Sequence, residues 1–506
     1  MRNLTRPFAV AAAGVLTLST ALLAPSSAAP PGPDSSDLRD AVTIDGLMAH
    51  LEELQAIADA NDGTRSSGTP GYDASADYVA DVLGDAGYAI TRQSFEYDLF
   101  HEHGPSSLSV TPAGPTAPYV DGEDFTVMEY SGSGTATGAL QAVDVTLPPP
   151  ATPGSTSGCE ATDFAGFTAG NVAVMQRGTC TFRTKADNAA AAGASAAIIF
   201  NEGQEGRTDL LNGTLAPPQA GIPVLGTTFA LGEELVGLDG SQATVTTDVS
   251  STRETTENVI AESTGGRGDR VVMAGAHLDS VAEGPGINDN GSGTAAILET
   301  ALQMAEQGIE PTNRVRFAFW GAEESGLIGS QHYVDQLTKR ERKDIHLYLN
   351  FDMVGSPNFA RFVYDGDGSA FGLKGPNGSA QIEEVFTDYF TSQDLASEPT
   401  EFSGRSDYQG FINAGIPAGG LFTGAEGVKT EEQVALYGGE AGVAYDPCYH
   451  AECDDIGNVS AQALDEMSDA VAHAVLTFAM TKADVSGTKS STDVRKQEML
   501  GAHALR

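Results

Sequence analysis

The chain has 506 residues, of which 69 are Asp or Glu and 27 are Lys or Arg, giving a formal net charge of −42. Its length leaves room for two domains, and a hydrophobic content of 41% fits a globular protein. The acidity argues against nucleic acid or an anionic membrane as a partner, because binding to phosphates needs clustered Lys and Arg.

The N-terminal segment has the features of a secretory signal peptide. Arg2 and Arg6 precede an apolar run from Phe8 to Ala24, which small residues follow. We therefore predict a signal peptide over residues 1–29, a disordered lead-in or pro-segment over residues 30–40, and a secreted, extracellular protein. The apolar run is short for a membrane anchor, and no later stretch is apolar enough to cross a bilayer, so we expect no membrane attachment.

Two helices and a strand are predicted after the lead-in. Apolar residues recur at three- and four-residue spacing from Leu47 to Ile57, which predicts a helix. A second helix is expected from about Ala74 to Leu83, and alternating residues predict a strand from Ala89 to Tyr97. These elements belong to a module that a second module interrupts in the sequence. We place the first part of the interrupted module at residues 41–129.

A different module follows, and we place it at residues 130–248. Its sequence predicts, in order, a strand, a helix and a strand, at residues 172–176, 184–192 and 196–200. No cluster of His, Asp and Glu marks a catalytic site in this module. The polar stretch from Thr247 to Glu257 is interpreted as a link back to the first module.

The first module resumes at residues 249–482, where predicted strands alternate with helices. The strands are expected at residues 271–275, 315–320 and 346–354, and the helices at residues 294–307 and after the N-cap residue Ser460. This α/β rhythm implies a mostly parallel, mixed sheet with helices on both faces. The polar tail at residues 483–506 lies outside the module.

The four cysteines can pair in three ways. Because an exported protein favours disulfides and the two close pairs lie far apart in the sequence, we expect the bonds Cys159–Cys180 and Cys448–Cys453. The chain has no C-x-x-C spacing, which argues against a zinc site built from cysteines.

Potential metal ligands follow three of the predicted strands. His277 and Asp279 come after the first strand, Glu323 and Glu324 after the second, and Asp352 lies at the end of the third. Functional groups gather beyond the carboxyl ends of parallel strands, so these side chains are expected to lie together.

Two further candidates complete a set of metal ligands. Asp289 lies in a glycine-rich loop before a helix, and His450 lies inside the short loop between Cys448 and Cys453. Two histidines and three carboxylates suit two zinc ions that share one bridging carboxylate. A carboxylate at Asp279 could accept the second ring N–H of His277 and fix its orientation.

At these residues the chain resembles the secreted zinc aminopeptidases of the aminopeptidase Y and bacterial leucyl aminopeptidase type, which have the zinc exopeptidase fold. The resemblance rests on four motifs: Gly275-Ala-His277-Leu-Asp279-Ser280, Asn288-Asp289-Asn290-Gly291-Ser-Gly293, Gly321-Ala-Glu323-Glu324 and Tyr449-His450. It implies that Asp289 bridges two zinc ions, with His277 and Asp352 completing one site and Glu324 and His450 completing the other.

The resemblance also implies the roles of residues that do not bind metal. Glu323 would be the general base that activates water and later protonates the leaving amine. Tyr449 would donate a hydrogen bond to the tetrahedral oxyanion. Asp279 would orient His277, and Arg405 would line the substrate site. The disulfide that flanks Tyr449 and His450 also matches the family.

The module at residues 130–248 resembles a protease-associated domain, a smaller, β-rich α/β domain that is inserted in several peptidase families. This resemblance rests on Cys159, on Asp163-Phe164 and on the segment from Gln176 to Phe182. By analogy, such a domain would shape access to the active site or contact the substrate.

The sequence therefore predicts a secreted, monomeric aminopeptidase with two zinc ions, which acts on peptides with free N-termini. The exposed carboxylates would also suit a structural calcium ion. Three alternatives stay open: a carboxypeptidase or dipeptidase with the same metal core, an acyltransferase like the single-zinc glutaminyl cyclases, and a binding protein without a working metal site, like the transferrin receptor.

Overall fold

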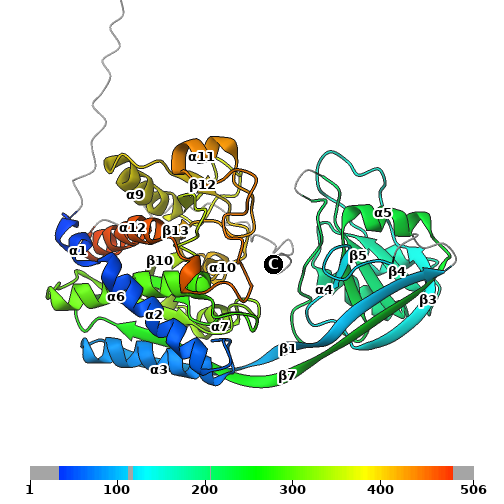
Figure 1. Ribbon diagram of the computed structural model, residues 1–506, viewed down its shortest axis with the longest axis horizontal. Helices are drawn as coiled ribbons and strands as arrows, with labels where there is room; N and C mark the ends of the chain where they lie inside the picture. The colour runs from blue at the N-terminus through cyan, green and yellow to red at the C-terminus, as the bar shows by residue number, and fades with distance from the viewer. Residues whose placement is uncertain (1–32, 112–117, 205–206, 483–506) are drawn as a thin grey trace, which may run out of the picture.

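The computed structural model describes residues 33–111, 118–204 and 207–482, in two lobes joined by a long two-stranded arm (Figure 1). The predicted signal peptide and C-terminal tail lie outside these residues. The end of the predicted lead-in forms a helix, α1 (Ser36–Ala41), so the expected disorder is wrong there. The reason is Leu38, which is only 1% exposed and joins the main hydrophobic core.

The larger lobe is built on a mixed sheet with the strand order β12-β11-β13-β10-β8-β9-β7. Its strands are β7 (Gln242–Glu262), β8 (Arg267–His277), β9 (Asn313–Trp320), β10 (Ile345–Phe351), β11 (Phe362–Tyr364), β12 (Glu398–Thr400) and β13 (Ala418–Phe422). Strands β13, β10, β8 and β9 pair in parallel, whereas β7 and β11 run antiparallel to their neighbours β9 and β13. The sheet is therefore mostly parallel, as the sequence predicts.

Helices cover both faces of this sheet. One face packs against α2 (Ile44–Ala60), α3 (Pro70–Asp85), α6 (Gly293–Glu306), α9 (Ser379–Ser392) and α12 (Ala461–Met480), and the other against α7 (Ile328–Gln336) and α10 (Tyr408–Asn413). The short helices α8 (Glu341–Asp344), α11 (Glu431–Tyr437) and η3 (Ile456–Asn458) lie in the connections. The stripe of Leu47, Leu51 and Leu54 on α2 is fully buried, and each such leucine contributes roughly 1.5–3 kcal/mol of transfer free energy. Among the described residues, no helix is both long and apolar enough to span a membrane.

The arm that joins the lobes consists of β1 (Ala89–Thr111) and β7, which pair antiparallel along their whole length (Figure 1). Strand β1 extends well past the predicted end at Tyr97, and β7 includes the stretch from Thr247 to Glu257 that the sequence analysis interpreted as a link. The stretch of β7 does link the two modules, as expected, but the predicted end of β1 was wrong, because the middle of the arm is largely solvated and lacks the alternation of a half-buried strand. The residues of the arm form strands because they pair with residues more than a hundred positions away in the chain.

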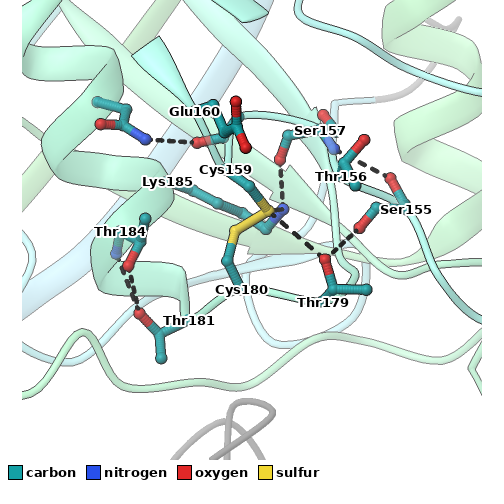
Figure 2. Close-up of a disulfide and its surroundings, with 12 residues drawn as sticks. Ser155, Thr156, Ser157, Cys159, Glu160, Thr179, Cys180, Thr181, Thr184 and Lys185 are labelled. Atoms are coloured by element: carbon teal, nitrogen blue, oxygen red, sulfur yellow. Dashed lines mark hydrogen bonds between the residues drawn. A yellow bond between two sulfur atoms is a disulfide. The ribbon is translucent and has the colours of Figure 1, made fainter. Parts of the chain in front are cut away.

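The smaller lobe is a second sheet with the order β3-β4-β5-β6-β2, in which β3 to β6 pair in parallel. Its elements are β2 (Phe125–Val127), β3 (Gly134–Ala142), η1 (Ala161–Phe164), β4 (Val172–Gln176), α4 (Phe182–Ala191), β5 (Ala196–Phe200), β6 (Val224–Thr227) and α5 (Phe229–Gly237). Strand β7 also pairs with β3, so one strand belongs to both lobes. Both expected disulfides are present, and Figure 2 shows Cys159–Cys180 beside α4.

Candidate active site

Three adjacent parallel strands bring acidic and imidazole side chains to one edge of the large sheet. His277 ends β8, Asp352 follows β10, and Glu323 and Glu324 follow β9. Because β10, β8 and β9 are neighbours that run in the same direction, their carboxyl ends meet at this edge. All four side chains are buried, with exposed fractions between 1% and 8%.

Asp289 is delivered by an irregular turn, η2 (Ile287–Ser292), that leads into α6. The two oxygens of the Asp454 carboxylate accept hydrogen bonds from the backbone N–H groups of Asn288 and Asp289, each at 2.9 Å. Gly293 lets the start of α6 approach the sheet, since a Cβ atom there would lie 2.3 Å from the carbonyl oxygen of Phe351. The backbone therefore fixes where the Asp289 side chain points.

The carboxylate of Asp289 lies between the two imidazoles. Its Oδ1 is 3.1 Å from Nε2 of His277, and its Oδ2 is 3.3 Å from Nε2 of His450. His277 Nε2 is also 3.3 Å from Oδ1 of Asp352, and His450 Nε2 is 3.2 Å from Oε2 of Glu324. The five side chains thus form two triads that share Asp289.

These separations fit two zinc ions. Ligand atoms at about 2.0–2.2 Å from a tetrahedral zinc ion lie roughly 3.3–3.6 Å from each other, close to the observed 3.1–3.3 Å. Imidazole nitrogen and carboxylate oxygen are the donors that zinc takes besides thiolate. In addition, Oε1 of Glu324 is buried and has no hydrogen-bond partner among the described residues. A polar atom in that position is stabilised by a cation.

The titration of the site reflects an excess of buried negative charge. Burial, opposed by the charge of His277 and reinforced by that of Glu324, raises the pKa of Glu323 well above its ordinary range. Burial would lower the pKa of His450, but the charges of Glu324 and Asp289 outweigh it and raise that pKa to about 9. In the protein without metal, the excess of acidic side chains therefore favours protonation of Glu323 and His450. The same excess of negative charge favours the binding of a cation.

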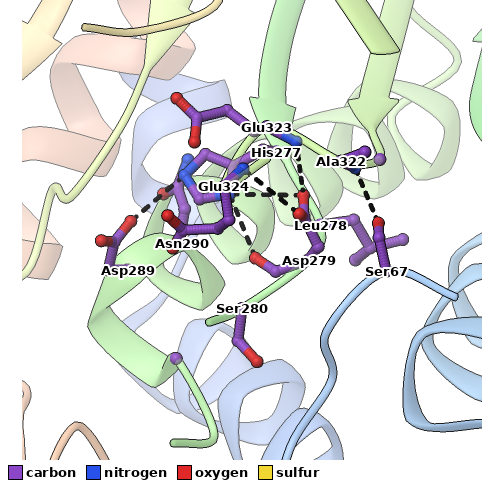
Figure 3. A network of polar contacts seen from close by, with 12 residues as sticks. Ser67, His277, Leu278, Asp279, Ser280, Asp289, Asn290, Ala322, Glu323 and Glu324 are labelled. Atoms are coloured by element: carbon purple, nitrogen blue, oxygen red, sulfur yellow. Dashed lines mark hydrogen bonds and ion pairs between the residues drawn. The ribbon is translucent and has the colours of Figure 1, made fainter. Parts of the chain in front are cut away.

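Asp279 holds the loop that carries Glu323 and Glu324 (Figure 3). Its carboxylate accepts the backbone N–H groups of Glu323 at 3.2 Å and of Glu324 at 3.3 Å. Nδ1 of His277 lies 3.1 Å from the backbone oxygen of Asp279 but 3.7 Å from its carboxylate. The sequence analysis assigned the carboxylate to the histidine, whereas the backbone carbonyl is the closer partner and the carboxylate is used by the glutamate loop.

The site opens into a cleft with about 550 Å³ of empty space, part of it open to solvent. Tyr449 stacks on His450 with ring centroids 3.8 Å apart, and its hydroxyl oxygen accepts a hydrogen bond from Nη2 of Arg405 at 3.2 Å. Arg405 also pairs with Glu426 at 2.6 Å. Apolar and aromatic side chains form much of the remaining wall: Met353, Tyr364, Tyr408, Phe422 and Ala425.

Three contributors to the site were missed in the sequence. Asp454 supports the Asp289 loop, and Ser406 donates its hydroxyl hydrogen to Oδ2 of Asp352. Arg65 is fully buried and donates to the carbonyl groups of Leu278, Pro285 and Gly286, which lie in the loop between His277 and Asp289. Asp454 directly follows Cys453, so the sequence placed it beside the predicted site. Arg65 lies in a turn-rich segment without any motif that indicates a role in the site.

Comparison with known proteins identifies both lobes. Residues 258–475 match the model of peptidase family M28, and residues 138–235 match the PA domain. The chain is 51% identical over 428 residues to an aminopeptidase of Pseudomonas aeruginosa, covering 84% of this chain and 79% of that protein. It is 43% identical to a probable lipoprotein aminopeptidase of Mycobacterium tuberculosis, covering 90% and 89% of the two chains. It is 40% identical to leucine aminopeptidase 2 of Trichophyton tonsurans, covering 88% and 86%.

Solved structures agree with these matches. An aminopeptidase from Aneurinibacillus sp. strain AM-1 superposes with a TM-score of 0.69 at 25% identity, covering 89% of this chain and 97% of that chain. A zinc aminopeptidase from Bacillus subtilis gives a TM-score of 0.57 at 26% identity, covering 88% and 97%. The chain therefore belongs to peptidase family M28, and its smaller lobe is an inserted protease-associated (PA) domain.

Proposed function

We propose that this chain, a zinc-dependent aminopeptidase, hydrolyses the first peptide bond of its substrates with two zinc ions and Glu323 as general base. One zinc ion would be held by His277 and Asp352, the other by Glu324 and His450, and Asp289 would bridge them. The observation that carries the proposal is the position of Asp289, whose two oxygens lie 3.1 Å and 3.3 Å from the two imidazoles.

The charge balance supports a dinuclear site. Three carboxylates and two neutral imidazoles offer three negative charges, while two zinc ions bring four positive charges. When bound, the zinc ions supply Lewis-acid chemistry, because they lower the pKa of the attacking water and polarise the scissile carbonyl group. The remaining carboxylate, Glu323, is then free to act as an acid–base group.

Glu323 lines the cleft beside the two ligand triads but is not itself needed to complete either of them. In the proposed reaction, its carboxylate accepts a proton from the attacking water as the new C–O bond forms. It then delivers this proton to the amide nitrogen as the C–N bond breaks, so that the leaving group departs as a neutral amine. Asp279 fixes the backbone of Glu323 and keeps the carboxylate aimed at the reacting atoms.

Tyr449 would stabilise the negative charge that develops on the carbonyl oxygen of the substrate. Burial raises the pKa of Tyr449 well above its ordinary value, so the phenol keeps its proton. Arg405 donates to the hydroxyl oxygen of Tyr449, which leaves the hydroxyl hydrogen available to the substrate.

The charges of the cleft favour a substrate with a free amine over one with a free carboxylate. Among the described residues that line it, Arg405 is the one permanent cation, and Glu426 neutralises it at 2.6 Å. Glu323 and Glu401 add negative charge that the metal ligands do not need. A carboxypeptidase would instead need an unpaired cation to hold the substrate carboxylate.

We also propose that the chain works outside the cell as a monomer, with residues 41–129 and 249–482 as the peptidase domain and residues 130–248 as the inserted domain. Two disulfides favour an oxidising compartment. All five metal ligands come from one chain, so a single chain forms a complete catalytic unit. A structural calcium ion stays a prediction; Asp365, Asp367 and Glu383 bring carboxylate oxygens within 4.8 Å of one another.

Metal analysis tests the dinuclear proposal. The purified mature protein should hold two zinc ions per chain, measured by elemental analysis after zinc loading. Treatment with 1,10-phenanthroline should abolish hydrolysis of Leu-p-nitroanilide, and added zinc should restore it. One tightly held ion per chain in a fully active protein would instead favour a single-zinc centre, as in the glutaminyl cyclase alternative.

A substrate panel tests the direction of attack. Aminoacyl-p-nitroanilides and peptides with free N-termini should be hydrolysed, whereas the same peptides with acetylated N-termini should not. Release of C-terminal residues from the acetylated peptides would favour the carboxypeptidase alternative and contradict the proposed function.

A further inference from the structure

The PA domain contains a pocket that takes no part in the proposed mechanism. It has about 410 Å³ of empty space, part of it open to solvent, and lies where the segment after β4 meets the start of α4. The Cys159–Cys180 disulfide, shown in Figure 2, lies beside it. Its wall includes Gly154, Arg177, Gly178, Thr179, Glu202 and Arg207. Apolar side chains, Pro153 and Phe182, and a few charged groups line this pocket, and a few polar groups on an otherwise apolar wall can fix the orientation of a ligand.

Arg177 is the central feature of this pocket. Its side chain is buried, with an exposed fraction of 7%, and Nη1 donates to Oδ1 of Asn201 at 3.3 Å. Within the described part of the chain, Arg177 has no ion pair, and its Nε and Nη2 atoms donate no hydrogen bond. A buried guanidinium that lines a pocket and keeps free donors is costly unless an anion joins it.

The neighbouring carboxylate is already fully used. Oε1 of Glu202 accepts the backbone N–H groups of Gly154 at 2.6 Å and Ser155 at 2.8 Å, and its Oε2 pairs with Nη1 of Arg207 at 3.0 Å. Glu202 thus balances Arg207 and leaves the charge of Arg177 without a direct partner.

A further cation lies behind the disulfide. The fully buried side chain of Lys185 on α4 donates to the carbonyl oxygen of Ser157, and its Nζ is 3.7 Å from Sγ of Cys159 (Figure 2). Among the described residues that line the pocket, Arg177 and Arg207 face one carboxylate, Glu202. Lys185, behind them, interacts with Glu202 and also with Asp163 and Asp144. This local excess of positive charge stands out in a chain whose net charge is −42.

We propose that this pocket of the PA domain binds a carboxylate group of a peptide, with Arg177 as its main ligand and Arg207 beside it. A planar carboxylate can accept two parallel hydrogen bonds from Nε and Nη2 of a guanidinium, which are the donors that Arg177 keeps free. The inference rests on the proposed function only in taking peptides as the class of molecule that this protein meets.

The carboxylate could come from the C-terminus of a peptide or from an Asp or Glu side chain, and binding experiments can separate these sources. Three acetylated tetrapeptides would be titrated into the zinc-loaded, full-length protein by calorimetry: Ac-Ala-Ala-Ala-Ala as the free acid, the same peptide as the C-terminal amide, and an amide with Asp at its third position. Acetylation of the N-terminus prevents hydrolysis by the aminopeptidase.

We expect the free acid or the Asp-containing amide to bind, and the neutral amide to bind at least about 10-fold more weakly, because charge-assisted hydrogen bonds are lost. Arg177→Gln should weaken binding of the acidic peptide by a similar factor. Arg183→Gln is the matched control, since Arg183 lies nearby on α4 and pairs with Asp187 rather than lining the pocket. Arg177→Lys keeps the charge without the planar fork and should retain partial binding.

Several results would overturn the proposal. Equal binding of the acid and the neutral amide would exclude carboxylate recognition, and unchanged binding by a folded Arg177→Gln variant would exclude this pocket. Loss of peptide binding after chelation would place the peptide at the zinc site. Inorganic phosphate that binds more tightly than the acidic peptide would favour a phosphate site. Hydrolysis of Leu-p-nitroanilide, measured on the same samples, reports separately on the proposed function and should not change in Arg177→Gln.

Discussion

Each lobe has a pocket beside which buried charges lack a full set of partners of opposite sign, and these charges are mostly acidic in the large lobe and basic in the PA domain. At the edge of the large sheet, Asp289, Glu324 and Asp352 surround two histidines, and no Lys or Arg among the described residues pairs with these three carboxylates. In the PA domain, Arg177 and Lys185 are buried without an ion pair to any described carboxylate.

This difference teaches how a fold specifies the charge of its ligand. Buried charges in proteins are normally paired, because desolvation of an unpaired charge costs several kcal/mol. An excess of buried charge of one sign therefore marks a place where a ligand of the opposite sign completes the structure. This reasoning is the basis of both proposals, divalent cations for the first lobe and a carboxylate for the second.

The largest expected effect is a loss of activity in a variant of the acidic cluster that still binds zinc, which would distinguish the general base from the metal ligands. Glu323→Gln should lower kcat on Leu-p-nitroanilide by roughly 10²–10⁴-fold, which is the range of general acid–base catalysis, while both zinc ions stay bound. Glu306→Gln, at the exposed end of α6, is the control and should keep wild-type activity. If Glu323→Gln lost zinc along with activity, Glu323 would be a ligand rather than the base.

The next effect concerns the hydroxyl group of Tyr449, a neutral donor that lines the cleft. Tyr449→Phe removes the hydroxyl group that we propose as the donor to the developing oxyanion, so kcat should fall by about 10²–10³-fold with little change in KM. Tyr119→Phe in the PA domain removes a hydroxyl group that, among the described residues, donates to Glu234, and it should have no effect on kcat. A rise in KM with unchanged kcat for Tyr449→Phe would mean that Tyr449 holds the substrate rather than the transition state.

A smaller effect is expected when Asp454 is changed, because its carboxylate positions the backbone of Asp289, the proposed bridging ligand. In Asp454→Asn, one backbone N–H group, of Asn288 or Asp289, would face an amide NH₂ group, and the Asp289 turn would lose its fixed position. Zinc affinity should fall by about 10–100-fold, as is common when the partners of metal ligands are changed. Competition with a chromogenic chelator measures this change. The adjacent Asp455→Asn, on an exposed side chain, should bind zinc like the wild type.

The smallest effect concerns His473, a half-buried histidine that stays neutral. His473 on α12 shares a hydrogen bond with Ser35 at 2.8 Å, and burial, followed by the charge of Arg39, lowers its pKa to about 4. In the unfolded chain a histidine titrates near pH 6.5. The stability that neutral His473 contributes is therefore complete above pH 6.5 and is lost as the pH falls towards 4.

The Tm of the wild type should accordingly fall more steeply between pH 6.5 and 4 than that of His473→Gln, measured by calorimetry. Loss of zinc at low pH affects both proteins and cancels in the difference. His103→Gln, on an exposed side chain of the arm, is the control and should follow the wild type. Parallel curves for the wild type and His473→Gln would contradict the assigned pKa of His473.

The sequence by itself determined the elements whose signal is local. The apolar spacing from Leu47 to Ile57 gave α2, and the N-cap Ser460 marked the start of α12. The alternation of strands and helices gave the mixed sheet, and the residues at the ends of three strands gave the candidate ligands. Each of these features depends on neighbours within a few residues, or on the general rule that parallel strands place their carboxyl ends at one edge.

Only the tertiary structure decided the features that depend on partners far apart in the chain. The arm of β1 and β7 joins residues that neither alternate in polarity nor lie near each other, so its length follows from pairing alone. The same holds for Asp279, whose carboxylate serves a loop more than forty residues away, and for Arg65, which binds carbonyl groups more than two hundred residues away. A charged side chain takes whichever partner the fold brings within hydrogen-bond distance, and spacing along the sequence does not encode that choice.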